Sequence, residues 1–181
     1  MRIIKAFLFG AVSLFIIITL LSLLIPSNIK VSRTVLINNT TAPAISSQVA
    51  YMSNWRNWHP LFKSDSAKIY INPGTKGVKS FVVEYNDKKV TIDFTGTDSS
   101  TATHIIKFNM SSPGENEIRN EIIIIPVPNQ NNVQVEWQAL NKLRWYPWEK
   151  FYGIFIDKLT GPGYETALNG LKTFIETGAG K

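Results

Sequence analysis

Two histidines are the candidates for acid–base chemistry in this sequence. His59 lies between Trp58 and Pro60, where we place the mouth of a cavity, and an imidazole that titrates near neutral pH is suited to proton transfer. Simple exposure or a backbone hydrogen bond at a helix end explains the same histidine without any activity. His104 opens a predicted strand and has no potential partner nearby in the sequence. His59 is therefore the first residue to test as an acid or base, and no catalytic set is predicted.

Three carboxylates within predicted strands are the other candidates: Glu84, Asp93 and Glu136. A carboxyl group that points into an apolar cavity has a raised pKa and can act as a general acid. Each of the three, however, alternates along its strand with apolar neighbours, and successive side chains of a strand point to opposite faces. We therefore expect all three on the solvent-exposed face.

The sequence predicts no metal site and no cofactor. It has no cysteine, no His-x-x-x-His pair and no Asp/Glu cluster with ligand spacing, and it lacks a phosphate-binding loop and a nucleophile elbow. The net charge is +6, but lysines and arginines never form a run of four. A basic surface near anionic headgroups explains this charge, and no nucleic-acid partner is expected.

The elements that position these residues follow from hydrophobic periodicity. Residues 30–37 alternate as a strand, and Ile45, Val49 and Met52 recur at helical spacing after Pro43. Residues 54–58 predict a short second helix. From residue 68 to 141, short β-rich runs separated by turn residues predict an antiparallel meander. Its strands are expected at residues 68–72, 78–85, 89–96, 102–110, 117–125 and 133–140.

Helical spacing returns after Pro147 and predicts a long C-terminal helix, with a kink or short break at residues 161–163, Gly-Pro-Gly. Aromatic residues are dense around the start of this helix, which suits either the wall of an apolar cavity or a headgroup interface. We expect the covered sheet face and one stripe of the helix to line a cavity. Its predicted lining residues are Trp55, Trp58, Trp137, Trp148, Phe151, Phe155 and Leu159.

Residues 6–25 contain no charged side chain, and as a helix they are about 30 Å long, the thickness of a bilayer core. The run is longer than the apolar region of a secretory signal and has no Ala-x-Ala-like cleavage site, although a cleaved signal and a buried core helix are the alternatives. We expect a tail and transmembrane anchor at residues 1–29 and one domain at residues 30–178. The short tail favours a cytoplasmic N-terminus with the domain on the extracytoplasmic side.

The order of these elements, with the motifs at residues 54–60 and 156–172, resembles the SRPBCC (START / Bet v 1-like) superfamily. More narrowly, it resembles the membrane-anchored polyketide cyclase/dehydrase-like proteins. The resemblance implies an α+β helix-grip fold, in which a curved antiparallel sheet of six or seven strands wraps around a long C-terminal helix and encloses an apolar cavity. Members bind lipids, sterols or polyketides, and only some are enzymes, so no catalytic residues are carried over.

Three functions follow as hypotheses. The first is membrane-anchored binding of a hydrophobic small molecule or lipid, for which no catalysis is required. The second is a cyclase, dehydratase or hydrolase acting on a hydrophobic carbonyl compound. The third is an interaction module at the membrane whose cavity is filled by its own side chains.

Overall fold

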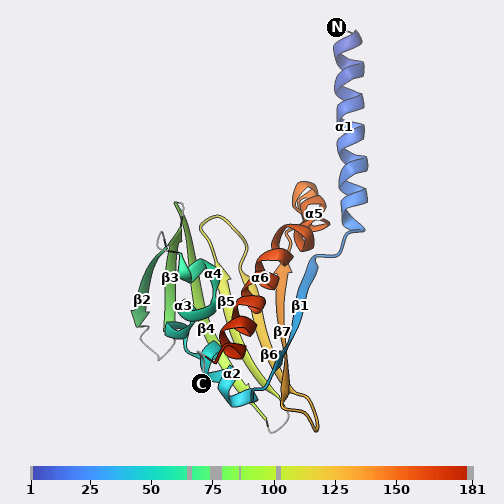
Figure 1. The fold of residues 1–181 in the computed structure, drawn as a ribbon. Helices are drawn as coiled ribbons and strands as arrows, with labels where there is room; N and C mark the ends of the chain where they lie inside the picture. Colours follow the sequence, from blue (N-terminus) through green and yellow to red (C-terminus); the bar gives the residue numbers. More distant parts are fainter. Residues whose placement is uncertain (1, 65–66, 74–78, 86, 101–102, 179–181) are drawn as a thin grey trace.

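A computed structural model describes residues 2–64, 67–73, 79–85, 87–100 and 103–178. The chain begins with α1 (Arg2–Leu23), which projects away from a domain built of one sheet and the helices packed on it (Figure 1). Within α1 only Ser22 is buried, so α1 is not the core helix of the domain. Its length and composition are those of a membrane span, and a signal sequence near an N-terminus shares them.

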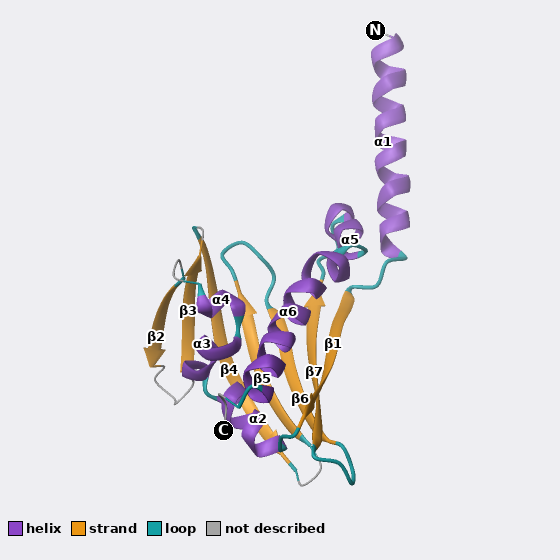
Figure 2. Ribbon diagram, in the orientation of Figure 1, coloured by secondary structure: helices purple, strands orange, loops and turns teal. Residues whose placement is uncertain are grey.

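Seven strands form one antiparallel sheet in the order β1-β7-β6-β5-β4-β3-β2 (Figure 2). The predicted meander is confirmed, because β2 to β7 are consecutive neighbours, while β1 closes the sheet by pairing with β7. Val78 and Ala102, the predicted first residues of two strands, lie outside the described residues. The strands are β1 (Asn28–Asn38), β2 (Lys68–Pro73), β3 (Lys79–Tyr85), β4 (Lys88–Ser99), β5 (His104–Ser111), β6 (Ile118–Pro126) and β7 (Asn132–Lys142).

The helices of the domain gather on one face of the sheet (Figure 1). Between β1 and β2 lie α2 (Ala42–Ala50), a 3-10 turn η1 (Met52–Asn54), α3 (Trp55–Trp58) and α4 (Pro60–Lys63). After β7 come α5 (Pro147–Gly153) and α6 (Ile156–Glu176), and α6 runs along the sheet beside β1. A curved antiparallel sheet that wraps around a long C-terminal helix is the expected α+β helix-grip fold.

Of the kink or short break predicted at residues 161–163, the break is wrong, because α6 continues through Pro162 to Glu176, and the kink stays a prediction. Pro162 removes the hydrogen bond to the Lys158 carbonyl, but both residues are exposed and water satisfies that carbonyl at low cost. The helix is interrupted earlier instead, at Ile154 and Phe155 between α5 and α6.

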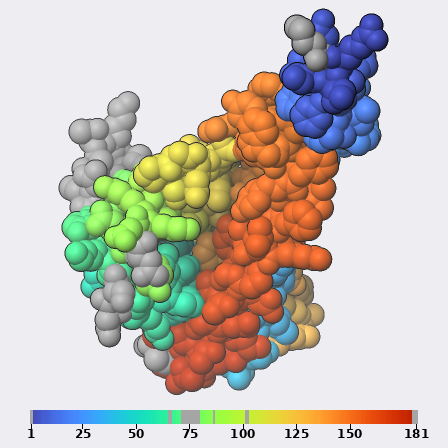
Figure 3. Space-filling view, turned by 90° about the horizontal axis from the view of Figure 1, so that it is seen from above, coloured from blue at the N-terminus to red at the C-terminus, as the bar shows by residue number. Residues whose placement is uncertain are grey.

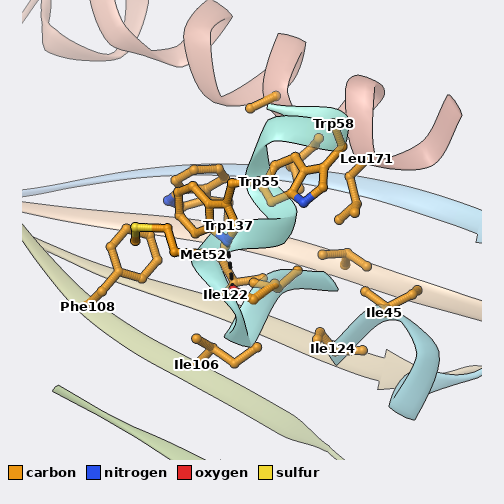
Figure 4. Close-up of a cluster of buried hydrophobic side chains, with 14 of the residues drawn as sticks. Ile45, Met52, Trp55, Trp58, Ile106, Phe108, Ile122, Ile124, Trp137 and Leu171 are labelled. Atoms are coloured by element: carbon orange, nitrogen blue, oxygen red, sulfur yellow. Dashed lines mark hydrogen bonds between the residues drawn. The ribbon is translucent and has the colours of Figure 1, made fainter. Parts of the chain in front are cut away.

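The space between α6 and the sheet is filled by three buried tryptophans, Trp55, Trp58 and Trp137 (Figure 4). The Trp55 ring packs against both others, with centroids 5.2 Å from Trp58 and 6.0 Å from Trp137. Each indole N–H is satisfied: Trp55 donates to the Val49 carbonyl, Trp58 to the Gln48 carbonyl and Trp137 to Asn120 Oδ1. The centre of the grip is therefore a packed core.

Candidate ligand-binding site

The seven predicted lining residues do not share one cavity. Trp55, Trp58 and Trp137 belong to the packed core, each 2% exposed or less. The other four are exposed and lie on α5, at the interruption after it, or in the first turn of α6. These four are Trp148, Phe151, Phe155 and Leu159, with exposed fractions of 66%, 37%, 55% and 59%.

A pocket of about 530 Å³ lies at this end of the domain, and we call it the α1-side pocket. It is bounded by the β5–β6 loop, the end of β7, α5 and the first turns of α6. Figure 3 looks down on this end, where the yellow β5–β6 loop and the orange α5 lie on opposite sides of a hollow. Its apolar lining comprises Ile118, Leu143, Trp148, Tyr152 and Ile156.

Amide and charged side chains contribute to the lining of the α1-side pocket. Asn141 contributes to the lining and is 7% exposed, and its Nδ2 is enclosed by the protein with no hydrogen-bond partner among the described residues. Asn116 donates from its Nδ2 to Glu149 Oε1, which joins the β5–β6 loop to α5 across the pocket. Lys142 and Arg144 are exposed at the rim. The pocket therefore suits a ligand with an apolar body and one or more acceptor oxygens.

The wall formed by α5 is held by close packing beneath it. Gly153 ends α5 where a Cβ atom would lie 2.2 Å from Leu143 Cδ1 and 2.7 Å from Ile29 Cδ1. Only glycine allows this approach without displacing both side chains. Lys150, on the same helix, is 4% exposed and donates from its Nζ to the linker that follows α1. The α1-side pocket is therefore built next to the point where α1 leaves the domain.

His59 lines a different pocket of about 480 Å³, between α4, α6 and the end of β3. Its ring is stacked on Trp55 at 5.4 Å and lies edge-on to Phe62 at 5.1 Å, and its Nδ1 is buried without a hydrogen-bond partner. Burial lowers the pKa of His59 to about 4, because the charged imidazolium would lose its hydration. His59 is therefore neutral at pH 7, and none of the described residues lining this pocket is acidic.

The three carboxylates alternate with buried residues of their strands and so lie on the outer face of the sheet. Glu136 accepts hydrogen bonds from the Ser32 hydroxyl at 2.6 Å and from Gln138 Nε2 at 2.7 Å. The bond from Ser32 lowers the pKa of Glu136, the opposite of what a general acid at neutral pH requires. Glu84 lies 3.8 Å from Lys89, and Asp93 is partly exposed. Within the described part of the chain, no three His, Asp or Glu side chains gather as a metal site.

Of the residues that line the α1-side pocket, sequence reasoning named only Trp148. It missed Asn141 in the lining, and it missed Lys150, which holds α5 to the linker. Asn141 is the penultimate residue of β7, where an asparagine ordinarily indicates a turn rather than a pocket wall. Lysine is rarely buried, so nothing in the local pattern of α5 predicts the burial of Lys150. The one available signal is the aromatic density at residues 145–152, which correctly draws attention to this end of the domain.

Comparison with known proteins gives the fold and no closer relationship. No protein-family model matches the chain, and no curated protein is similar to it in sequence. Solved structures do match. An aromatase/cyclase from a Streptomyces species is 13% identical, with a TM-score of 0.61, over 82% of this chain and 94% of that chain.

Two further structures extend this likeness. A START superfamily protein from Mycobacterium smegmatis is 17% identical, with a TM-score of 0.57, over 82% of this chain and 97% of that chain. Norcoclaurine synthase from Thalictrum flavum, in complex with dopamine and hydroxybenzaldehyde, is 12% identical, with a TM-score of 0.58, over 83% of this chain and 88% of that chain. The chain has the helix-grip fold of START-like proteins, as its resemblance to the SRPBCC superfamily implies.

Proposed function

We propose that the chain is a single-pass membrane protein whose helix-grip domain binds a hydrophobic small molecule or lipid in the α1-side pocket. The observation that carries this proposal is the pocket itself, about 530 Å³ in volume and bordered by α5, which packs against α1. This volume falls within the usual range for small-molecule sites, about 300–1,000 Å³. The apolar wall supplies most of the binding free energy, and the exposed cations Lys142 and Arg144 at the rim attract an acceptor oxygen of the ligand.

The two other hypotheses have less support. An enzyme would need a second acid or base beside His59, and the described residues around it provide no carboxylate. The packed tryptophan core agrees with an interaction module, but such a module does not require a large apolar pocket beside α1. Among the SRPBCC-like structures above, one is described as an aromatase/cyclase and another as a synthase, so the fold itself is compatible with catalysis.

Native mass spectrometry of the full chain extracted in mild detergent tests the proposal. We expect a co-purified lipid or other hydrophobic molecule. Thr160→Trp, which places an indole in the α1-side pocket, should abolish the adduct, whereas Leu159→Trp at the neighbouring exposed position should retain it. An adduct that persists in folded Thr160→Trp would place the ligand elsewhere. The absence of any adduct in the wild-type chain would favour the interaction module.

The proposed orientation has the N-terminus in the cytoplasm and the domain on the extracytoplasmic side. Protease treatment of spheroplasts tests it, because an extracytoplasmic domain is cleaved from Tyr51 onward without breaking the inner membrane. Full protection of the domain would reverse the orientation and leave the binding proposal unaffected.

A further inference from the structure

Exposed apolar side chains are concentrated in one short stretch of the domain. Among the described residues after α1, thirteen large hydrophobic side chains are exposed, and seven of them fall within residues 145–159. The other six are spread over the linker, four strands and the residue between α2 and η1. The seven define a continuous segment on and around α5, which we call the α5 surface: Trp145, Trp148, Phe151, Tyr152, Ile154, Phe155 and Leu159.

The α5 surface is fixed beside the end of α1. Helix α5 packs on α1, where Ser22 is fully buried, and Lys150 Nζ donates to the Ile25 carbonyl at 2.8 Å and to Ser27 Oγ at 2.6 Å. Figure 1 shows α5 beside the last turn of α1, at the end of the domain from which α1 projects. The α5 surface is therefore held at the height at which the C-terminal end of α1 would leave a bilayer.

The chemistry of this segment suits the headgroup region of a bilayer. Tryptophan and tyrosine are enriched at membrane–water interfaces. Here the Tyr146 ring stacks on Trp148 at 5.1 Å and makes a tilted contact with Trp145 at 5.0 Å. The exposed cation Arg144 directly precedes the segment, and the exposed Lys158 lies within it. Its two acidic groups are already engaged, since Glu149 pairs with Asn116 and Asp157 pairs with Arg33.

We infer that the α5 surface is a second membrane contact, which inserts into the headgroup region of the bilayer that α1 spans. The inference rests on the proposed function, because it requires α1 to be a membrane span. Trp148 and Tyr152 belong to both the α5 surface and the wall of the α1-side pocket. A membrane-derived ligand therefore reaches the pocket along the bilayer surface.

Tryptophan fluorescence tests this contact directly, because α1 contains no tryptophan and the other three are buried in the core. The full chain is reconstituted in vesicles of phosphatidylcholine and phosphatidylglycerol whose acyl chains carry bromine either near the headgroup or at the bilayer centre. We expect stronger quenching by the shallow bromine. The double variant Trp145→Phe/Trp148→Phe should lose this quenching, and Phe155→Asp/Leu159→Asp, at exposed positions, should weaken it.

The outcomes separate the two proposals. If the chain resists alkaline extraction from the vesicles but its fluorescence is equally insensitive to shallow and deep bromine, α1 is inserted and the second contact is overturned. Insertion without shallow quenching, together with disulfide-linked dimers of Phe151→Cys, would assign the surface to a second copy and likewise overturn the inference. A chain that alkali removes from the vesicles contradicts the membrane span on which both proposals depend.

Discussion

Lys150 and Ser27 join the end of α5 to the linker between α1 and β1 by a hydrogen bond of 2.6 Å from Nζ to Oγ. The same ammonium group donates to the Ile25 carbonyl at 2.8 Å. Two polar groups of the linker thus obtain their partner from a residue more than a hundred positions later in the sequence. This bridge sets the position of α5, and through it one wall of the α1-side pocket.

Lys150→Met should lower the free energy of unfolding by about 1–3 kcal/mol, because it removes two charge-assisted hydrogen bonds that the buried ammonium group donates to the linker. Urea unfolding of the detergent-solubilised chain, followed by tryptophan fluorescence, measures this change. Lys63→Met at an exposed position of α4 is the control and should have little effect. Equal stability of the two variants would show that the bridge contributes nothing to the fold.

His59 should make stability depend on pH between about 5 and 7. Its pKa is about 4 in the folded chain and near 6.5 when unfolded, so only the unfolded state binds a proton in this window. Stability is therefore complete above the unfolded pKa and falls as pH decreases, by about 2 kcal/mol between pH 7 and pH 5. Urea titrations at the two pH values measure the loss.

His59→Phe keeps an aromatic ring against Trp55 and Phe62 and should remove most of this pH dependence. His104→Asn should retain it. Two carboxylates with shifted pKa values do not contribute to the change between pH 5 and pH 7. A hydrogen bond from Ser32 lowers the pKa of Glu136, and one from Arg33 lowers the pKa of Asp157, so neither carboxylate takes up its proton in this window. A wild-type chain with the same stability at pH 5 and pH 7 would disprove the burial effect.

Two glycines of α6 should respond to alanine in opposite directions. At Gly170 a Cβ atom would lie 2.3 Å from the Trp58 carbonyl oxygen, and the backbone of α3 must shift to admit it. Gly170→Ala should therefore destabilise the fold by about 1–3 kcal/mol. At Gly163 no atom lies within 4 Å of the added Cβ, so Gly163→Ala should stabilise the helix by about 0.5–1 kcal/mol. Thermal unfolding of the two variants in parallel checks both signs.

The buried hydrogen bond from Trp137 Nε1 to Asn120 Oδ1, 3.0 Å long, should contribute measurably to the tryptophan core (Figure 4). Asn120→Leu leaves the indole N–H unpaired and should cost about 1–3 kcal/mol. In the cycle with Trp137→Phe, the double variant should lose less than the sum of the two single losses, by about 0.5–3 kcal/mol. Additive losses would mean that the two side chains do not interact. Gln134→Leu, on the other face of β7, serves as the control.

Much of the fold is predictable from the sequence because its elements are local. Alternation along β5 to β7 and the spacing of Ile45 and Val49 on α2 give the strands and this helix to within a few residues. The interruption of the last helix was misplaced, because a proline whose lost hydrogen bond faces water leaves the helix intact. The interruption lies at residues 154–155 instead, next to Gly153, which packs closely on Leu143 and Ile29, residues distant from it in the sequence.

The candidate site was only partly predictable, because burial depends on contacts between segments distant in the sequence. Residue type indicates which aromatic side chains can bind an apolar ligand, but burial decides which of them are available. Trp55, Trp58 and Trp137 are enclosed by segments distant in sequence, whereas Trp148 remains at a pocket wall. That any of the seven contacts a ligand stays a prediction.

The pairing of β1 with β7 has a consequence for biosynthesis. The strand that directly follows α1 is the first part of the domain to leave the ribosome. Among the described strands it pairs only with β7, which is synthesised about a hundred residues later. In the membrane-anchored chain that we propose, one edge of the growing sheet is held beside the membrane without its neighbour during that interval. We expect the sheet to close only after release of the C-terminal segment, with β1 shielded until then by the membrane surface or by a chaperone.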